Sequence, residues 1–246
     1  MADRTLKTSP QIYARIGGVI YLILILAGML GEIFVRGKLV VGGDPTATAQ
    51  NIMASPVLWR MGIAGDLIMH VCDVPLMLVF YVLLRPVNKN IALLAVLFNL
   101  VQTSALVANK LNLLAALFLL GNADYLKAFE PHQLYALAYL SIKLHDYGFG
   151  VGLIFFGFEC LVIGYLIYRS GFLPRTIGVL MQIAGICYLT NSFALILAPT
   201  FENKLFPAIM VPAFIAEMSL CLWLIVKGVN VPKWEEMANA GGLSAV

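Results

Sequence analysis

Six long runs of apolar residues constrain this chain more than any other feature of its sequence. The hydrocarbon core of a bilayer is about 30 Å thick, so a helix that crosses it needs about 20 mostly apolar residues. The runs extend from about Tyr13 to Phe34, Val57 to Leu84, Ile91 to Leu120, Tyr139 to Tyr168, Leu173 to Leu197 and Phe206 to Val226. They predict an all-α fold, a polytopic membrane helix bundle with short loops, six transmembrane helices and a single membrane domain over 1–246. A seventh span is left open.

The composition excludes the other common classes of protein. Hydrophobic residues make up 61% of the chain and charged residues 12%, whereas soluble domains have about 45–50% apolar and about 25% charged residues. The net charge of +3 is small and the basic residues are scattered, so we expect no nucleic-acid partner. The four cysteines lie inside apolar runs without CxxC spacing, which favours buried thiols over disulfides or a zinc site.

The distribution of Lys and Arg between the predicted spans indicates an orientation, because basic residues in short loops favour the cytoplasmic side. One side carries nine of them, at Arg4, Lys7, Arg15, Arg85, Lys89, Arg169, Arg175, Lys227 and Lys233. The other side carries five, at Arg36, Lys38, Arg60, Lys127 and Lys204. We therefore expect a multi-pass protein of the cell (plasma or inner) membrane, with the lipid bilayer as its partner and both termini in the cytoplasm.

Three shorter segments lie outside the apolar runs. Residues from Pro45 to Ala54 and from Asn122 to Phe129 are predicted to form short helices at the membrane interface. The amphipathic tail after Pro232 is short, and we expect it to be mobile.

Charged side chains inside the apolar runs are the most informative for function. An ionisable residue at mid-bilayer costs about 2.5–3.5 kcal/mol, so it usually faces the bundle interior and has a partner. Asp66, His70 and Asp73 on the second run are spaced by four and three residues, which places them on one stripe of a helix.

Counting helical rise from the ends of the runs sorts the polar residues into two tiers. The tier near the midplane consists of His70, Asp73, Asn99, Gln102, Glu159 and Glu217. The tier nearer the outer face consists of Asp66, Lys110, Lys143, His145, Asp146 and Asn191. Two such tiers predict a polar intramembrane cavity that opens to the outside.

The midplane tier has several interpretations. One imidazole and three carboxyl groups, from His70, Asp73, Glu159 and Glu217, could bind Zn, Mn or Fe. However, no HExxH or similar ligand spacing is present, so metal binding is a weak hypothesis and no cofactor is identified. A network of hydrogen bonds with Asn99 and Gln102 is the simpler interpretation, and a proton relay or a ligand site remains open.

The outer tier has two interpretations. Lys110 and Lys143 could form structural ion pairs with Asp66 and Asp146, or they could receive an anionic ligand or a lipid head group from the outer leaflet. His145 and Asp146 could form a pH-sensitive pair, although neighbours in a helix do not face each other, so contact between them is not implied.

Two short stretches carry a resemblance to a known family. Tyr13-Ala14-Arg15-Ile16-Gly17-Gly18 enters the first run, and Ser170-Gly171-Phe172-Leu173-Pro174-Arg175 leads into the fifth, followed by Gly178, Gly185 and Tyr188-Leu189. With the order and lengths of the helices, these stretches resemble the prokaryotic integral membrane family called domain of unknown function 4386, over about Tyr13 to Lys227. The resemblance implies a multi-helix membrane protein and supplies no catalytic residues.

Three classes of function remain open on the sequence. The first is binding or transport of a small polar or amphiphilic solute, with proton-handling carboxyl groups at the midplane. The second is a membrane-embedded enzyme, with or without a metal, that uses His70 with Asp73, Glu159 or Glu217, and the third is an accessory subunit of a membrane complex. Transport usually favours internal repeats, which we do not find, and an enzyme favours a tighter motif. The two polar tiers favour the first class, with a small molecule or a lipid as ligand and an oligomer or larger complex left open.

Overall fold

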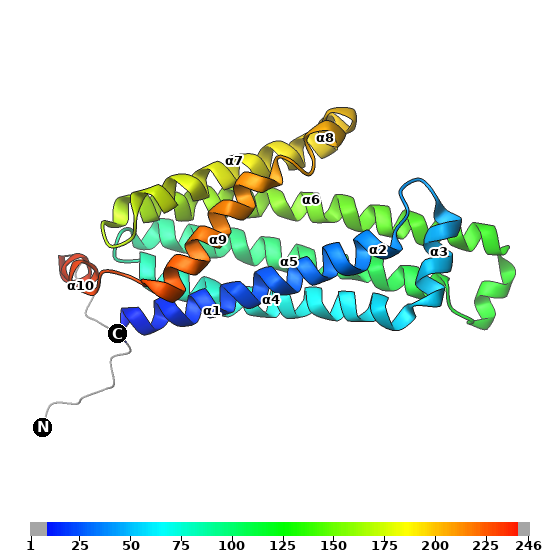
Figure 1. Cartoon of the computed structure of the whole chain (residues 1–246), viewed down its shortest axis with the longest axis horizontal. Helices are drawn as coiled ribbons and strands as arrows, with labels where there is room; N and C mark the ends of the chain where they lie inside the picture. Colours follow the sequence, from blue (N-terminus) through cyan, green and yellow to red (C-terminus); the bar gives the residue numbers. More distant parts are fainter. Residues whose placement is uncertain (1–8, 241–246) are drawn as a thin grey trace, which may run out of the picture. The chain divides into compact units, whose positions relative to one another are not determined.

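The computed structural model describes residues 9–240, apart from the side chain of Asn203, and within them it contains helices and no strands. Figure 1 shows the helices coloured along the chain. The elements in order are α1 Pro10–Met29, the π-helix η1 Leu30–Arg36, α2 Gly37–Leu39, α3 Pro45–Ala54, α4 Pro56–Leu84, α5 Lys89–Leu119, the 3₁₀ helix η2 Asp124–Ala128, α6 Pro131–Ser170, α7 Arg175–Leu197, α8 Pro199–Leu205, α9 Met210–Val226 and α10 Val231–Ala240. The predicted all-α fold is confirmed.

The long helices agree with the predicted spans. Five stretches in the described chain are long and apolar enough to cross a membrane, namely Pro10–Leu39, α4, α5, α6 and α7. The pair α9 and α10 is bent by 99° and passes the same test as one unit, which gives up to six spans. α6 begins at Pro131, whereas the corresponding apolar run begins near Tyr139.

Polar side chains fix several helix ends. The carboxylate of Asp44 accepts a hydrogen bond from the backbone N–H of Ala47 at 2.9 Å, and Pro45 occupies the first turn of α3. In the turn between α6 and α7, Gly171 has a φ of +67°, a conformation that favours glycine. The predicted short helix over 45–54 is confirmed, and the segment 122–129 contains the short helix η2.

The chain divides into two compact units. The first contains residues 9–22, 72–102 and 153–240 of the described chain, and the second contains residues 23–71 and 103–152. Helices α1, α4, α5 and α6 contribute residues to both.

In the first unit, glycines allow helices α6 and α7 to approach closely. A Cβ at Gly164 would come within 2.6 Å of the carbonyl oxygen of Gly178, and a Cβ at Gly185 within 2.6 Å of the carbonyl oxygen of Gly157. Small residues at such crossings permit backbone-to-backbone packing in membrane bundles.

Residues 231–240 of the C-terminal segment form the helix α10, so the mobility expected after Pro232 is wrong for them, and residues 241–246 lie outside the described residues. Pro232 lies in the first turn of α10, and the indole of Trp234, which is 7% exposed, donates a hydrogen bond to the carbonyl oxygen of Leu83 at 2.9 Å. The backbone N–H of Asn230 donates to the carbonyl oxygen of Phe172 at 3.1 Å. These contacts could not be predicted from the sequence because both acceptors are backbone atoms from distant parts of the chain.

The second unit has its own apolar core. Trp59 is 1% exposed and donates from Nε1 to the carbonyl oxygen of Leu113 at 3.0 Å. Ile52 of α3 and Ile142 of α6 belong to the same cluster of buried side chains. Trp59 is therefore a core residue of this unit.

Candidate functional site

The first helix changes to π geometry where it meets Asp66 in the second unit. The π-helix η1 contains Glu32 and Arg36, and the Arg36 Nε donates to Glu32 at 2.8 Å. A side chain at Gly31 would overlap the carboxylate of Asp66, so glycine is required for this approach. π-Helical turns in proteins often occur at functional sites.

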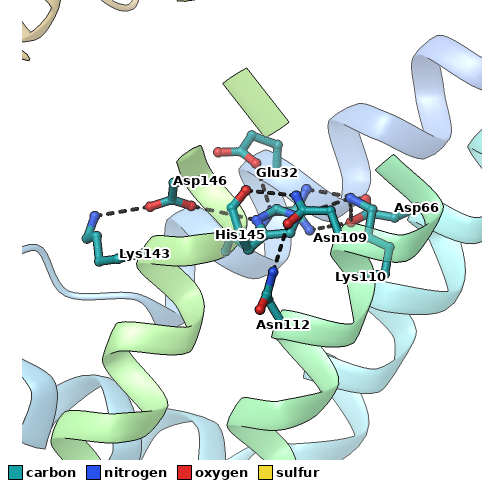
Figure 2. A network of polar contacts seen from close by, with 9 residues as sticks. Glu32, Asp66, Asn109, Lys110, Asn112, Lys143, His145 and Asp146 are labelled. Atoms are coloured by element: carbon teal, nitrogen blue, oxygen red, sulfur yellow. Dashed lines mark hydrogen bonds and ion pairs between the residues drawn. The ribbon is translucent and has the colours of Figure 1, made fainter. Parts of the chain in front are cut away.

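Asp66 is the centre of a buried ion-pair network, which we call the Asp66 network (Figure 2). Its Oδ2 accepts from Arg36 Nη1 at 2.7 Å and from Lys110 Nζ at 2.9 Å, and its Oδ1 accepts from Arg36 Nη2 at 3.2 Å. The side chains of Asp66 and Lys110 are 1% and 2% exposed, and that of Arg36 is 10% exposed. The predicted pair between Lys110 and Asp66 is confirmed.

The network continues into α6 through His145. The Nζ of Lys110 lies 3.2 Å from His145 Nε2, and Asn109 Nδ2 donates to the backbone carbonyl of His145 at 2.8 Å (Figure 2). Asn112 donates in turn to Asn109 Oδ1 at 2.9 Å. The backbone of α6 approaches closely here, because a side chain at Gly148 would overlap the amide of Asn109.

The second predicted ion pair lies at the more exposed edge of this network. Lys143 Nζ is 3.1 Å from Asp146 Oδ2, and both side chains are about two-fifths exposed. His145 Nδ1 lies 3.7 Å from Asp146 Oδ1, which is close for sequence neighbours but too long for a hydrogen bond. The ring of His145 and the carboxylate of Asp146 are therefore closer than expected for neighbouring residues of a helix, whose side chains do not face each other.

His70 is also buried in the second unit. It is 2% exposed, and its Nε2 has no hydrogen-bond partner in the part of the chain that the structure describes. It lies within electrostatic range of Lys110, Asp66 and His145.

Asn99 joins two carboxyl groups in the first unit, in what we call the Asn99 cluster. Its Nδ2 lies 3.1 Å from Asp73 Oδ1 on α4 and 3.2 Å from Glu159 Oε2 on α6, and it reaches Gln102 Oε1 at 3.5 Å. Asp73 is 7% exposed and Glu159 is 3% exposed. The predicted network with Asn99 and Gln102 is thus present for Asp73 and Glu159, but no hydrogen bond joins His70 or Glu217 to these two amides among the described residues.

Glu217 of α9 is held by two tyrosines of the same unit. Tyr21 donates to its Oε2 at 3.1 Å, and Tyr188 donates to its Oε1. Glu217 is 8% exposed and lies within electrostatic range of Glu159. Acids from α4, α6 and α9 thus gather in this unit.

Three residues of these clusters were not predicted from the sequence. Arg36 follows the first apolar run and was assigned to an outer loop, whereas the helix continues through it. Tyr21 and Tyr188 lie inside apolar runs, and the signal that could have found them is that a buried tyrosine hydroxyl usually needs an acceptor. Asn191, predicted in the outer tier, belongs to the first unit and is 6% exposed.

The residues considered for a metal fall into different units. His70 belongs to the second, and Asp73, Glu159 and Glu217 belong to the first. Across residues 9–240 no group of three or more His, Cys, Asp or Glu side chains is placed to hold a metal ion.

The predicted polar cavity stays a prediction. A hollow in the first unit is lined mainly by apolar side chains and has essentially no room for a water molecule. It is lined by Met77, Phe80, Tyr81, Leu84, Ala92, Ala95, Ile163 and Leu166, none of which belongs to either polar cluster.

The fold and the buried polar clusters define a polytopic integral membrane helix bundle. The family described as "Domain of unknown function (DUF4386)" matches residues 16–228, so the chain belongs to this family and the resemblance found in the sequence is confirmed. A protein of Archaeoglobus fulgidus described as "Uncharacterized protein" is 29% identical over 166 residues, which cover 68% of this chain and 83% of that protein. No solved structure matches the chain significantly.

Proposed function

We propose that this membrane protein binds or transports a small polar or amphiphilic solute, and that the carboxyl groups of Asp73, Glu159 and Glu217 handle protons in that process. The observation that carries the proposal is the position of Asn99, whose single amide nitrogen lies within hydrogen-bond distance of carboxyl oxygens on two other helices.

This geometry favours a shared proton. An amide donor that reaches both carboxyl groups holds Asp73 and Glu159 near each other, and both side chains are almost completely buried. Two negative charges repel strongly where water does not screen them, so carboxyl pairs of this kind commonly share one proton. A pair that holds one proton can release it when a solute or a change of conformation alters its surroundings.

The position of Glu217 supports the same role. Its two oxygens accept hydrogen bonds from the hydroxyl groups of Tyr21 and Tyr188, which are neutral donors and not cations. A carboxyl group solvated by hydroxyl groups can change its charge without breaking an ion pair.

Infrared pH-difference spectroscopy on the protein in lipid nanodiscs tests the proton-handling role directly. We expect a protonated-carboxyl band that titrates and that disappears in Asp73→Asn or Glu159→Gln. Glu235→Gln serves as the matched control, because this glutamate is exposed on α10. A spectrum in which the band is absent, or in which all three variants retain it, would contradict the proposal.

A solute screen tests the binding role. Bound solute stabilises the folded state in proportion to the logarithm of its concentration over Kd, so thermal unfolding in detergent can rank a panel of small amines, amino acids and short-chain amphiphiles. For any solute that raises the Tm, we expect Glu159→Gln to abolish the pH dependence of that rise. An unchanged pH dependence in Glu159→Gln would show that this carboxyl group does not take part in solute binding.

A further inference from the structure

Several helix ends of the first unit meet at one place. The segment between α9 and α10 is hydrogen-bonded to the start of α1 through Gln11, which donates from Nε2 to the carbonyl oxygen of Lys227 at 2.9 Å. The contacts of Asn230 with Phe172 and of Trp234 with Leu83 add the α6–α7 turn and the end of α4. We call this region the basic end.

The basic end carries a surplus of unpaired positive charge. Its acidic residues are Glu235 and Glu236, both on α10. Its basic residues in the described chain are Arg15, Arg85, Lys89, Arg169, Arg175, Lys227 and Lys233. Seven cations and two anions leave a formal charge of +5, and none of the seven forms an ion pair with another described residue.

The second unit shows that this surplus is not a general property of the chain. Of its six Lys and Arg residues, Arg36, Lys110, Lys127 and Lys143 pair with carboxylates. Unpaired cations are therefore concentrated at the basic end.

Arg85 marks a specific position within the basic end. It follows the last residue of α4 in the short turn to α5 and is half-buried. Its Nε atom is buried and has no hydrogen-bond partner among residues 9–240. A buried N–H donor without an acceptor destabilises the folded protein. We therefore expect an oxygen atom from outside the chain to accept a hydrogen bond from Arg85 Nε.

Aromatic side chains lie among these cations. The guanidinium of Arg175 is 5.6 Å from the ring centre of Tyr168, and Trp223 donates from Nε1 to the carbonyl oxygen of Gly228 at 3.0 Å. Tyr and Trp at the ends of apolar helices are typical of the depth at which lipid head groups lie. This argues against an RNA or an acidic protein as the partner of the basic end.

We infer that the basic end binds the phosphate groups of anionic phospholipids, with Arg85 contacting one phosphate directly. A phosphodiester supplies the acceptor that Arg85 Nε lacks, and arginine binds phosphate with parallel hydrogen bonds from its planar fork. The other six cations hold further anionic head groups by charge. This binding is independent of the solute binding proposed above.

The test is native mass spectrometry of the full chain released from nanodiscs that contain equal amounts of phosphatidylcholine and phosphatidylglycerol. We expect the protein to retain phosphatidylglycerol in preference to phosphatidylcholine. Arg85→Gln should lower this preference about fivefold, the factor that one basic residue contributes near an anionic surface. The combined change Arg85→Gln, Arg169→Gln and Arg175→Gln should lower it further.

The matched control removes three unpaired cations from outside the basic end, at Lys38, Arg60 and Lys204, and should leave the preference unchanged. Equal retention of the two lipids by the wild type would overturn the inference, as would equal losses in the control and in the triple variant. Binding of a poly(U) probe without a preference for phosphatidylglycerol would identify a nucleic-acid surface instead. Thermal unfolding in neutral detergent checks that the variants fold.

Discussion

Replacing Asp66 tests how the second unit is held together. In Asp66→Asn, the buried cations Arg36 and Lys110 lose the carboxylate that they share at 2.7 Å and 2.9 Å. Removing one partner of a buried ion pair costs about 3–5 kcal/mol, because the charge left behind is uncompensated. Both cations lose that partner here, so we expect a loss of free energy of unfolding at the upper end of this range.

Lys110→Met should cost less than Asp66→Asn. In that variant Asp66 still accepts two hydrogen bonds from Arg36, at 2.7 Å and 3.2 Å. The loss is then that of a hydrogen bond between charged groups, about 1.5–3 kcal/mol. The order of the two variants, and not only the size of each effect, follows from the geometry.

SDS titration in mixed micelles measures both free energies of unfolding. Trp59 is buried in the second unit and can report its unfolding by fluorescence if Trp223 and Trp234 are replaced by Phe. Asp124→Asn is the control, because its pair with Lys127 is almost fully exposed and such pairs contribute little. A loss below about 1 kcal/mol for Asp66→Asn, or a larger loss for Lys110→Met, would refute the reasoning.

Three further predictions concern close packing, the C-terminal helix and the orientation. Gly31→Ala should destabilise the protein by about 1–3 kcal/mol in the same titration, because the added methyl group overlaps the carboxylate of Asp66. Gly42→Ala is the control and should have little effect, because Gly42 has open space around it. Equal effects of the two changes would contradict this account. Trp234→Ala should expose α10 to limited proteolysis, because it removes both the buried ring and the hydrogen bond that it donates, and unchanged cleavage rates would show that α10 is held otherwise. Cysteines placed at Lys89 and Lys127 should react with an impermeant maleimide from opposite sides of the membrane, the first from the cytoplasm, and labelling of both from one side would rule out the proposed topology.

The membrane-spanning helices could be predicted because the bilayer sets their length. An apolar run of about 20 residues can satisfy its backbone hydrogen bonds in lipid only as a helix or as part of a closed barrel. Each of the six runs contains a helix. The ends of the helices could not be predicted equally well. α6 continues N-terminally to Pro131, beyond the apolar run that begins near Tyr139, and the run alone could not show this.

The pair between Lys110 and Asp66 could be predicted because charges at a similar depth in hydrocarbon usually find each other. Arg36 was missed for a different reason. A basic residue just after an apolar run has the pattern of a loop, and only the π-helical turn of η1 brings its guanidinium to Asp66. Gly31 lies in this turn and leaves room for the carboxylate of Asp66, a close approach that the pattern of apolar residues does not encode.

The two polar clusters differ in what a change of charge would do to them. In the Asp66 network one carboxylate neutralises two buried cations, so a proton added to Asp66 would leave both uncompensated and would weaken the contacts among η1, α4 and α5. In the first unit, Glu159 and Glu217 accept from an amide and from hydroxyl groups, which tolerate either charge state of a carboxyl group. A protein that must keep its fold while protons move can therefore place the movement at these acids and leave the ion pairs to hold the helices.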